Sequence, residues 1–306
     1  MSLYSMLAGK GPSGFGYGST AEEVTAGRDL HGKRYLITGS NSGIGLETAR
    51  VLTLRGATVL CAARTAEKAR EATAGFTGGQ TIPVPCELSE PASVRACVAA
   101  VRALGTPLDG IIANAGIMAL PKLEQKYGYE LQFFTNHVGH YILVTGLLDQ
   151  LTADGRVVVL SSAAHKNAPA AGIVFDNLSG ERDYSAWGTY GQSKLANLLF
   201  VRELARRFAG TGRIAHAVHP GVIATNLGRH MPWYVHAGLT IAVPLFMKTI
   251  PQGAATETWA ATHPDAAKTN GEYLSDCNVA VSSALGQDQA LATRLWEETE
   301  RIVAGV

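Results

Sequence analysis

The sequence predicts an α/β fold, a single doubly wound domain of the Rossmann type with a parallel sheet and helices on both faces. Three observations lead to this prediction. Short apolar strands alternate with helical segments from about residue 33 to residue 219. The strands are apolar throughout, which is typical of a parallel sheet buried between two helical layers. A glycine-rich turn follows the first strand and opens the first helix, as in a βαβ nucleotide-binding unit.

The composition supports one large globular domain. The chain has 306 residues, of which 46% are hydrophobic and 17% charged. Its net charge of +1 gives no electrostatic support for binding nucleic acid or an anionic membrane. The N-terminal residues lack a basic region followed by an apolar core, so we expect no secretory signal. The cysteines are scattered without C-x-x-C or clustered histidine, which predicts no metal site, no disulfide framework and a cytoplasmic protein: Cys61, Cys86, Cys97 and Cys277.

Residues 1–30 form a Gly/Ser-rich arm that precedes the predicted Rossmann-type domain, residues 31–306. The segment from Thr20 to Glu23 has capping-box spacing and predicts a short helix in this arm. We expect the arm to be peripheral, either partly ordered against the domain or flexible. The predicted strands cover residues 33–38, 57–63, 81–86, 110–114, 156–161 and 214–219. The predicted helices cover residues 46–55, 66–74, 89–104, 123–150 and 190–208.

The segment 231–250 is nearly free of charge, and its length is close to the ~20 residues that a membrane span needs. However, it contains Pro232, His236, Pro244 and Lys248, and it follows a strand of the same domain. We therefore expect a mobile helical lid at about 225–250 over an apolar substrate pocket. Peripheral membrane contact is the alternative, and a membrane span is not expected.

The first glycine-rich turn has the spacing G-x-x-x-G-x-G, and not the tighter G-x-G-x-x-G of the commonest dinucleotide fingerprint. Glycine lets the backbone turn sharply and approach a ligand closely. The helix that begins near Ile44 would direct its unpaired N–H groups at a pyrophosphate. We expect a dinucleotide to bind at Gly39, Asn41, Ser42, Gly43, Ile44 and Gly45.

The end of the second strand bears on the choice of dinucleotide. NAD-binding folds place a carboxylate there to hold the ribose hydroxyls. Here the strand ends without one, and Arg64 follows it. An arginine at this position can pair with a 2′-phosphate, which favours NADP(H), with NAD(H) as the alternative. The plainer interpretation is that Arg64 is an ordinary solvated charge.

Tyr190 and Lys194 are four residues apart in a predicted helix, so both side chains lie on one face. A free tyrosine has a pKa of ~10 and is a poor base at neutral pH. A neighbouring ammonium favours the phenolate, so we expect Lys194 to lower the pKa of Tyr190. The pair could then exchange a proton with an alcohol oxygen. Taken alone, the two residues could equally be a surface tyrosine and a solvated lysine.

Several further motifs occur in a fixed order along the chain. With them, the sequence resembles the short-chain dehydrogenase/reductase family from about Gly32 to its end. Residues 135–140 and 190–197 resemble the branch of the retinol dehydrogenases and WW domain-containing oxidoreductases, as does the segment 18–21. The motifs are residues 38–45, Asn114-Ala115-Gly116, Asn136, Ser161-Ser162, Tyr190-x-x-x-Lys194, and Pro220-Gly221 with Thr225.

The resemblance implies a role for each motif. Tyr190 would be the general acid/base, and Lys194 would also bond the nicotinamide ribose. Ser162 would polarise the substrate oxygen, and we prefer it to Ser161 because the family's catalytic serine usually stands second in such a pair. Asn136 would hold a water of a proton relay. The alternative is that the serines only end a strand and that Asn136 only bonds backbone in its helix.

The resemblance also implies further contacts with the cofactor. Glu87 and Leu88 would lie at the adenine, although the family usually has aspartate where Glu87 stands. Small residues would let the chain pass beneath the adenine ribose at Asn114, Ala115 and Gly116. The nicotinamide amide and the diphosphate would be flanked by Pro220, Gly221, Val222 and Thr225. The alternative is that these last residues only form a turn.

Together these features predict an NADP(H)-dependent oxidoreductase that interconverts an alcohol and a ketone or aldehyde. The apolar residues of the predicted lid favour a bulky, mostly apolar small-molecule substrate: Met231, Trp233, Tyr234 and Phe246. A non-catalytic dinucleotide sensor or scaffold on the same fold is one alternative. Another is a reductase of a carbon–carbon double bond, similar to the protochlorophyllide reductases. Family members are often dimers or tetramers, so we expect a homo-oligomer.

Overall fold

One eight-stranded sheet forms the centre of the molecule. The computed structural model describes residue 4, residues 8–223 and residues 247–306. The strand order is β10-β9-β8-β7-β4-β1-β2-β3, so the chain winds outward in both directions from the β1–β4 pair. Neighbouring strands are parallel except β9 and β10. The strands are β1 Arg34–Thr38, β2 Thr58–Ala63, β3 Gln80–Pro85, β4 Leu108–Ala113, β7 Leu151–Leu160, β8 Ile214–His219, β9 Tyr273–Ser275 and β10 Asn278–Val279.

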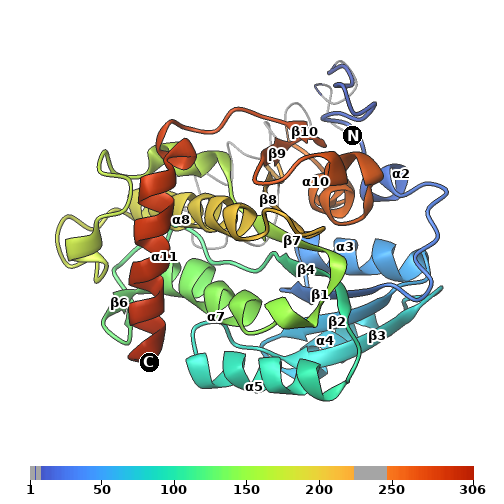
Figure 1. The fold of residues 1–306 in the computed structure, drawn as a ribbon, viewed down its shortest axis with the longest axis horizontal. Helices are drawn as coiled ribbons and strands as arrows, with labels where there is room; N and C mark the ends of the chain where they lie inside the picture. The colour runs from blue at the N-terminus through green and yellow to red at the C-terminus, as the bar shows by residue number, and fades with distance from the viewer. Residues whose placement is uncertain (1–3, 5–7, 224–246) are drawn as a thin grey trace.

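Helices cover both faces of this sheet (Figure 1). Alternate residues of the strands supply the two cores: Leu36 and Ile111 belong to one, and Ile37 and Ile112 to the other. Because helices bury both faces, the central strands carry apolar residues on both sides, as in the runs 35–37 and 157–160. The first core contains α5 Pro91–Ala103, α7 Gly139–Thr145, α8 Ala186–Arg207 and α11 Gln289–Ala304. The second contains α3 Gly43–Leu54, α4 Ala66–Thr73 and α10 Ile250–Thr262.

The predicted fold class is confirmed, but the helix predicted over residues 123–150 is wrong in its first part. The strands β5 (Gln125–Lys126) and β6 (Tyr129–Glu130) form a hairpin there. Its turn residues, Tyr127 and Gly128, have φ of 53° and 81°, the positive values that a tight hairpin turn requires. The Glu130 carboxylate then accepts a hydrogen bond from Phe133 N at 2.8 Å, and α6 (Leu131–Phe133) begins. A side-chain cap and a positive-φ turn therefore override the helical pattern.

The elements after residue 249 were not predicted from the sequence. They are α10, β9, β10 and α11, and β10 adds an antiparallel edge to an otherwise parallel sheet. The predicted lid lies outside the described residues except for Met247 to Ile250, and Ile250 is the first residue of α10.

The N-terminal arm packs on the C-terminal part of the domain. The capping box predicted at Thr20 is present and begins α2 (Ala21–Val24), which contacts α10 and α3. Earlier in the arm, Ser13 N donates a hydrogen bond to the Asn278 side chain at 3.0 Å, and Phe15 O accepts one from it at 3.1 Å. Residues 8–24 are thus ordered against the domain.

Helix α10 carries a fully buried carboxyl group, that of Glu257. Its only hydrogen-bond partner among the described residues is the Thr48 hydroxyl of α3, and Oε2 has none. Burial raises the pKa of Glu257 to about 8, and the bond from Thr48 acts in the opposite direction.

Glu257→Gln is therefore expected to stabilise the protein at pH 8.5. The folded-state pKa lies above the usual 4.5, so the wild type loses stability as pH rises from about 4.5 to about 8. The amide of the variant cannot ionise, so the variant keeps this part of the free energy of unfolding, which is on the order of 4 kcal/mol. Urea unfolding of both proteins at pH 5 and pH 8.5 measures the difference.

Glu203→Gln is the matched control. Glu203 is also buried, but Arg206 (2.7 Å) and Arg207 (3.0 Å) pair with it and hold its pKa below the usual range. Its stabilising contribution is present at neutral pH and is lost as pH falls, so this variant should be less stable at pH 8.5. If Glu257→Gln instead lowers stability at pH 8.5, the buried carboxyl is not the source of the pH dependence.

Candidate active site

The candidate site lies at the carboxyl ends of β1 and β4, where the strand order reverses and α/β sheets bind ligands. The glycine turn follows β1. Gly39 and Gly43 have φ of 71° and 59°, and a Cβ on Gly45 would lie 2.6 Å from Gly39 O. Ser42 is the N-cap of α3 but makes no side-chain cap, which leaves the first N–H groups of α3 without that partner. Together the positive φ values and the close approach show that only glycine fits here.

The segment after β4 packs against this turn. Asn114 Nδ2 donates to Thr38 O at 2.8 Å, and the backbone N–H groups of Asn114 and Ala115 both donate to Thr38 Oγ1 at 3.0 Å. A Cβ on Gly116 would lie 3.1 Å from Asn136 Oδ1 and 3.5 Å from Lys194 Nζ. The predicted motif after β4 therefore joins the glycine turn to the helices that carry Asn136 and Lys194.

Tyr190 and Lys194 lie on the first turns of α8, which Ser185 begins by capping Gly188 N. Both side chains are buried, with 7% and 3% exposed, so neither is a surface residue. Lys194 Nζ lies 5.7 Å from the centroid of the Tyr190 ring and donates to Leu160 O, the last residue of β7, at 3.0 Å. The helix thus holds both side chains against the carboxyl end of the sheet.

The two serines after β7 point to different partners. The Ser161 hydroxyl is buried and donates to the Lys194 carbonyl of α8 at 2.8 Å. The Ser162 hydroxyl accepts from Ala164 N at 3.1 Å and interacts with the Tyr190 phenol. Of the two, Ser162 is the one beside Tyr190.

The predicted effect of Lys194 on Tyr190 is not what the structure gives. Burial raises the pKa of Tyr190 to about 12, while the hydrogen bond with Ser162 acts to lower it. Burial also lowers the pKa of Lys194 to about 8. Desolvation is the largest cause of both shifts, and Lys194 is not among the causes of the shift of Tyr190. Tyr190 holds its proton at neutral pH.

Asn136 lies in a π-helical turn, Phe134–Val138, between α6 and α7. Its side chain accepts from Ile117 N at 2.8 Å and donates to Ile117 O at 2.9 Å and to Ser193 Oγ at 3.0 Å. The bulge in the helix brings this amide to the segment that follows Gly116. Single π turns of this kind are frequent at functional sites.

The other predicted cofactor residues lie around the same strand ends. Arg64 is exposed directly after β2 and makes no hydrogen bond or ion pair within the described residues. The Glu87 carboxylate accepts from Ser89 N at 3.3 Å and Ser89 Oγ at 3.0 Å, so one of its oxygens serves this turn. Leu88 is buried beside α7, where a Cβ on Gly139 would lie 2.3 Å from Leu88 O.

The segment after β8 lies at the same edge of the sheet as the glycine turn. Pro220 is partly buried, Gly221 has a φ of 90°, and Val222 is 62% exposed. The aliphatic chain of Lys248 packs on Gly221, and Lys248 Nζ pairs with Asp276 at 2.5 Å. Thr225 lies outside the described residues.

Sequence reasoning missed Trp187 and the hydrogen-bond partners of the site. Trp187 is 46% exposed, and its ring meets that of Tyr190 edge to face at 6.1 Å. The sequence could have revealed Trp187, because it stands three residues before Tyr190 and so lies on the same side of the helix. Thr38, His140 and Ser193 lie within the motifs named above, but no local pattern predicts their bonds across the site, because those partners are distant in the sequence.

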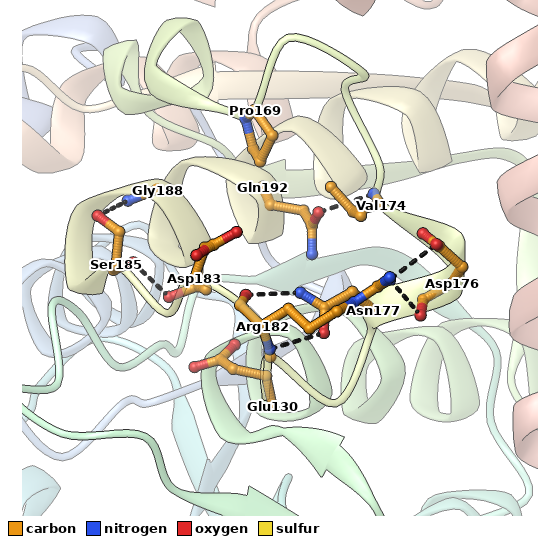
Figure 2. Close-up of a pocket in the computed structure, with 12 residues that line it drawn as sticks. Glu130, Pro169, Val174, Asp176, Asn177, Arg182, Asp183, Ser185, Gly188 and Gln192 are labelled. Atoms are coloured by element: carbon orange, nitrogen blue, oxygen red, sulfur yellow. Dashed lines mark hydrogen bonds and ion pairs between the residues drawn. The ribbon is translucent and has the colours of Figure 1, made fainter.

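A separate hollow of about 440 Å³ opens beside the first turns of α8 (Figure 2). Gln192 lies in its wall and accepts from Val174 N at 2.9 Å. Asp176 and Arg182 also line it and form an ion pair at 2.7 Å. Tyr190, Ser162 and Lys194 do not line this hollow, so it is distinct from the candidate site at the strand ends.

The described residues contain no group of three or more side chains suited to hold a metal ion. The four cysteines are buried and unpaired. None of the described helices has the length and apolar character needed to cross a bilayer.

A doubly wound sheet with a glycine turn after β1, and with a serine, a tyrosine and a lysine at the neighbouring strand ends, is typical of nucleotide-dependent oxidoreductases. The sequence model of the short chain dehydrogenase family matches residues 33–232, and the chain belongs to that family.

Its relatives include proteins of similar length. The chain is 41% identical over 322 aligned positions to the chloroplastic short-chain dehydrogenase TIC 32 B of Brassica napus, with 99% of each chain covered. It is 37% identical to human retinol dehydrogenase 14 over 90% of this chain and 87% of that protein. The match to human WW domain-containing oxidoreductase is 37% identical over 93% of this chain and 71% of that protein. The predicted family resemblance is confirmed.

Solved structures share the fold. A crystal structure of an uncharacterized protein from Mycobacterium Paratuberculosis is 32% identical, with a TM-score of 0.74 over 92% of this chain and 97% of that chain. A short chain dehydrogenase from Burkholderia cenocepacia, solved in complex with NADP, is 25% identical, with a TM-score of 0.66 over 81% and 97%.

Proposed function

We propose that the protein is an NADP(H)-dependent oxidoreductase that interconverts an alcohol and a ketone or aldehyde, with Tyr190 as the general acid/base. The observation that carries this proposal is the convergence of Tyr190, Ser162, Lys194 and Asn136 at the strand ends next to the glycine turn. The family membership of the chain supports the same reaction class.

The residues of the crevice fit a dinucleotide. Gly39 and Gly45 leave no room for side chains, and the N-terminus of α3 offers N–H groups to a pyrophosphate. We assign the cradle to residues 39–45, Leu88 and Asn114 to Gly116, with Pro220 to Val222 at the nicotinamide end. Glu87 can contribute only the carboxylate oxygen that Ser89 leaves free. When bound, the nicotinamide supplies or accepts the hydride.

The chain itself supplies orientation and the proton. Tyr190 is protonated at neutral pH and can therefore donate its proton to the oxygen of a carbonyl that is being reduced. Ser162 beside it donates a hydrogen bond where negative charge develops on that oxygen. Lys194 is cationic below about pH 8 and holds the β7 end against α8. Asn136 is hydrogen-bonded to Ile117 and Ser193 and so holds the segment after Gly116 in place next to Lys194.

The substrate class rests on the apolar groups around the entrance. Trp187 is exposed beside Tyr190, and Val222 is exposed on the segment after β8. Such a rim favours a bulky, mostly apolar alcohol, ketone or aldehyde.

Incubation with NADPH and a panel of apolar ketones, aldehydes and enones, followed at the nicotinamide absorbance, tests the proposal. Reduction of the carbonyl to an alcohol is the expected result. Saturation of only the carbon–carbon bond of the enones would identify the alternative double-bond reductase. Tight NADPH binding with no turnover of any compound would leave a nucleotide sensor or scaffold.

Arg64→Asp is expected to weaken NADPH binding about 10- to 100-fold while changing NADH binding much less. The exposed guanidinium follows β2, next to the strand that carries the glycine turn, and a carboxylate there would repel a 2′-phosphate. Fluorescence titration with both nucleotides measures the change. Arg70→Asp, an exposed arginine on α4, is the control. Equal losses for NADPH and NADH would remove Arg64 from phosphate recognition.

We further propose a cytoplasmic location and a homo-oligomeric state. Four buried, unpaired thiols are compatible with a reducing compartment. Val279, the last residue of the edge strand β10, and Val281 just after it are exposed and offer an apolar surface for a second copy of the chain.

A further inference from the structure

A buried chain of hydrogen bonds connects the glycine-turn side of the crevice to the π turn that carries Asn136. At one end, Thr38 Oγ1 accepts the backbone N–H groups of Asn114 and Ala115, both at 3.0 Å. The same hydroxyl lies 2.8 Å from His140 Nε2. At the other end, His140 Nδ1 lies 2.9 Å from Asn136 O. Thr38 and His140 are 1% and 0% exposed, so water does not compete for these bonds.

The partners determine where each proton of the chain lies. The Asn136 carbonyl can only accept, so His140 Nδ1 carries the hydrogen. Thr38 Oγ1 already accepts two N–H groups, so its own hydrogen points to Nε2, which must be unprotonated. The imidazole is therefore neutral and is the Nδ1–H tautomer. Burial lowers the pKa of His140 to about 4, which agrees with a neutral ring.

The chain continues from Asn136 to the candidate catalytic residues. The Asn136 side chain bonds both backbone groups of Ile117 and the Ser193 hydroxyl, and Ser193 in turn donates to Tyr190 O at 2.8 Å. Breaking the link at His140 would remove the bond that joins the β1 end to the Asn136 carbonyl, while the bonds of the Asn136 side chain to Ile117 would remain.

We propose that His140 is a positioning residue that keeps the nucleotide cradle and the Asn136–Lys194 side of the site in register. This inference rests on the proposed function. His140 touches neither Tyr190 nor Ser162 by hydrogen bond, and it acts through Thr38 and Asn136.

His137, in the π turn that precedes α7, provides a matched control. It is 1% exposed, three residues before His140, and burial lowers its pKa as well. Its Nε2 bonds Thr299 Oγ1 of α11 at 3.0 Å, and its ring also interacts with the Asn197 side chain of α8. His137 therefore has the burial of His140 but makes no bond to Thr38 or to the Asn136 carbonyl.

The test compares His140→Leu with His137→Leu in two assays, the NADPH dissociation constant and kcat at saturating NADPH and ketone. Both variants should lower Tm. Only His140→Leu should lower kcat, by at least about 10-fold, and weaken NADPH about 5-fold, because only its bonds join Thr38 to Asn136. His137→Leu should keep both values within about twofold of wild type.

Thr38→Val removes the hydroxyl that bonds His140, so it breaks the same link. This variant replaces His140→Leu in the test if His140→Leu does not fold. The double variant Thr38→Val/His140→Leu should be no slower than the worse single variant, because the chain is already broken. Thr38→Ser keeps the hydroxyl and should recover most of the loss.

Equal effects of His140→Leu and His137→Leu in both assays, or additive losses in the double variant, would overturn the inference. If the wild type reduces no carbonyl, the proposed function fails. The NADPH dissociation constants of the same variants then decide the role of His140 independently.

Discussion

Tyr190→Phe is expected to lower kcat for carbonyl reduction by on the order of 10³-fold, the size typical of a lost general acid. The substitution removes only the phenolic oxygen, and the buried ring keeps its packing against Trp187 and Lys194. NADPH affinity should therefore change by less than about twofold. Steady-state kinetics and a fluorescence titration with NADPH measure the two quantities.

Tyr141→Phe is the matched control. Tyr141 is a tyrosine of similar burial on α7, with its ring against Trp296 and away from the candidate site. This variant should keep wild-type kcat. A Tyr190→Phe enzyme with ordinary activity would rule out Tyr190 as the proton donor, and a large loss in both variants would point to damage of the fold.

Lys194→Met is expected to stabilise the protein while it impairs turnover. Burial holds the folded-state pKa of Lys194 near 8, below the usual 10.5, so the wild type carries an unfavourable buried charge at pH 7. That shift corresponds to about 3 kcal/mol of lost stability at pH 7, which the variant should regain. The Leu160 carbonyl still accepts Asn197 Nδ2 at 3.0 Å, so the substitution leaves it partnered.

The sign of the pH dependence follows from the lowered pKa. Between pH 8 and 10.5 the folded wild type binds fewer protons than the unfolded chain, so its stability rises with pH in that window. The advantage of Lys194→Met should therefore shrink from pH 7 to pH 10 in urea unfolding. Turnover should fall on the order of 10²-fold.

Lys122→Met, at an exposed position, should alter neither stability nor turnover and serves as the control. A less stable Lys194→Met would show that the lysine is held mainly by favourable contacts. Greater stability together with lost activity would identify Lys194 as a functional group maintained at a cost to the fold.

Much of the fold and of the candidate site could be predicted from local patterns. The apolar strands predicted the parallel sheet, because a strand buried on both faces has no polar side. The glycines at 39, 43 and 45 predicted the turn, because two of them need positive φ and the third has no space for a Cβ. The spacing of Tyr190 and Lys194 placed them on one face of α8, because a helix repeats every 3.6 residues.

The hairpin at Tyr127 and Gly128 and the π turn at Asn136 interrupt a stretch whose pattern is helical throughout. Their formation depends on caps and partners from elsewhere in the chain, such as Ile117 and Ser193. The bonds from Thr38 to His140 span 102 positions, which no local pattern can reveal.

The sequence by itself thus determined the order of the central-sheet strands from β1 to β8, the glycine turn and the residue types at the strand ends, because these depend on neighbours within a few positions. Only the tertiary structure decided the protonation states. Spacing alone predicted that Lys194 would make Tyr190 more acidic, whereas burial raises the pKa of Tyr190 and lowers that of Lys194. The cost of removing a charge from water depends on everything that surrounds the group, and that surrounding exists only in the folded chain.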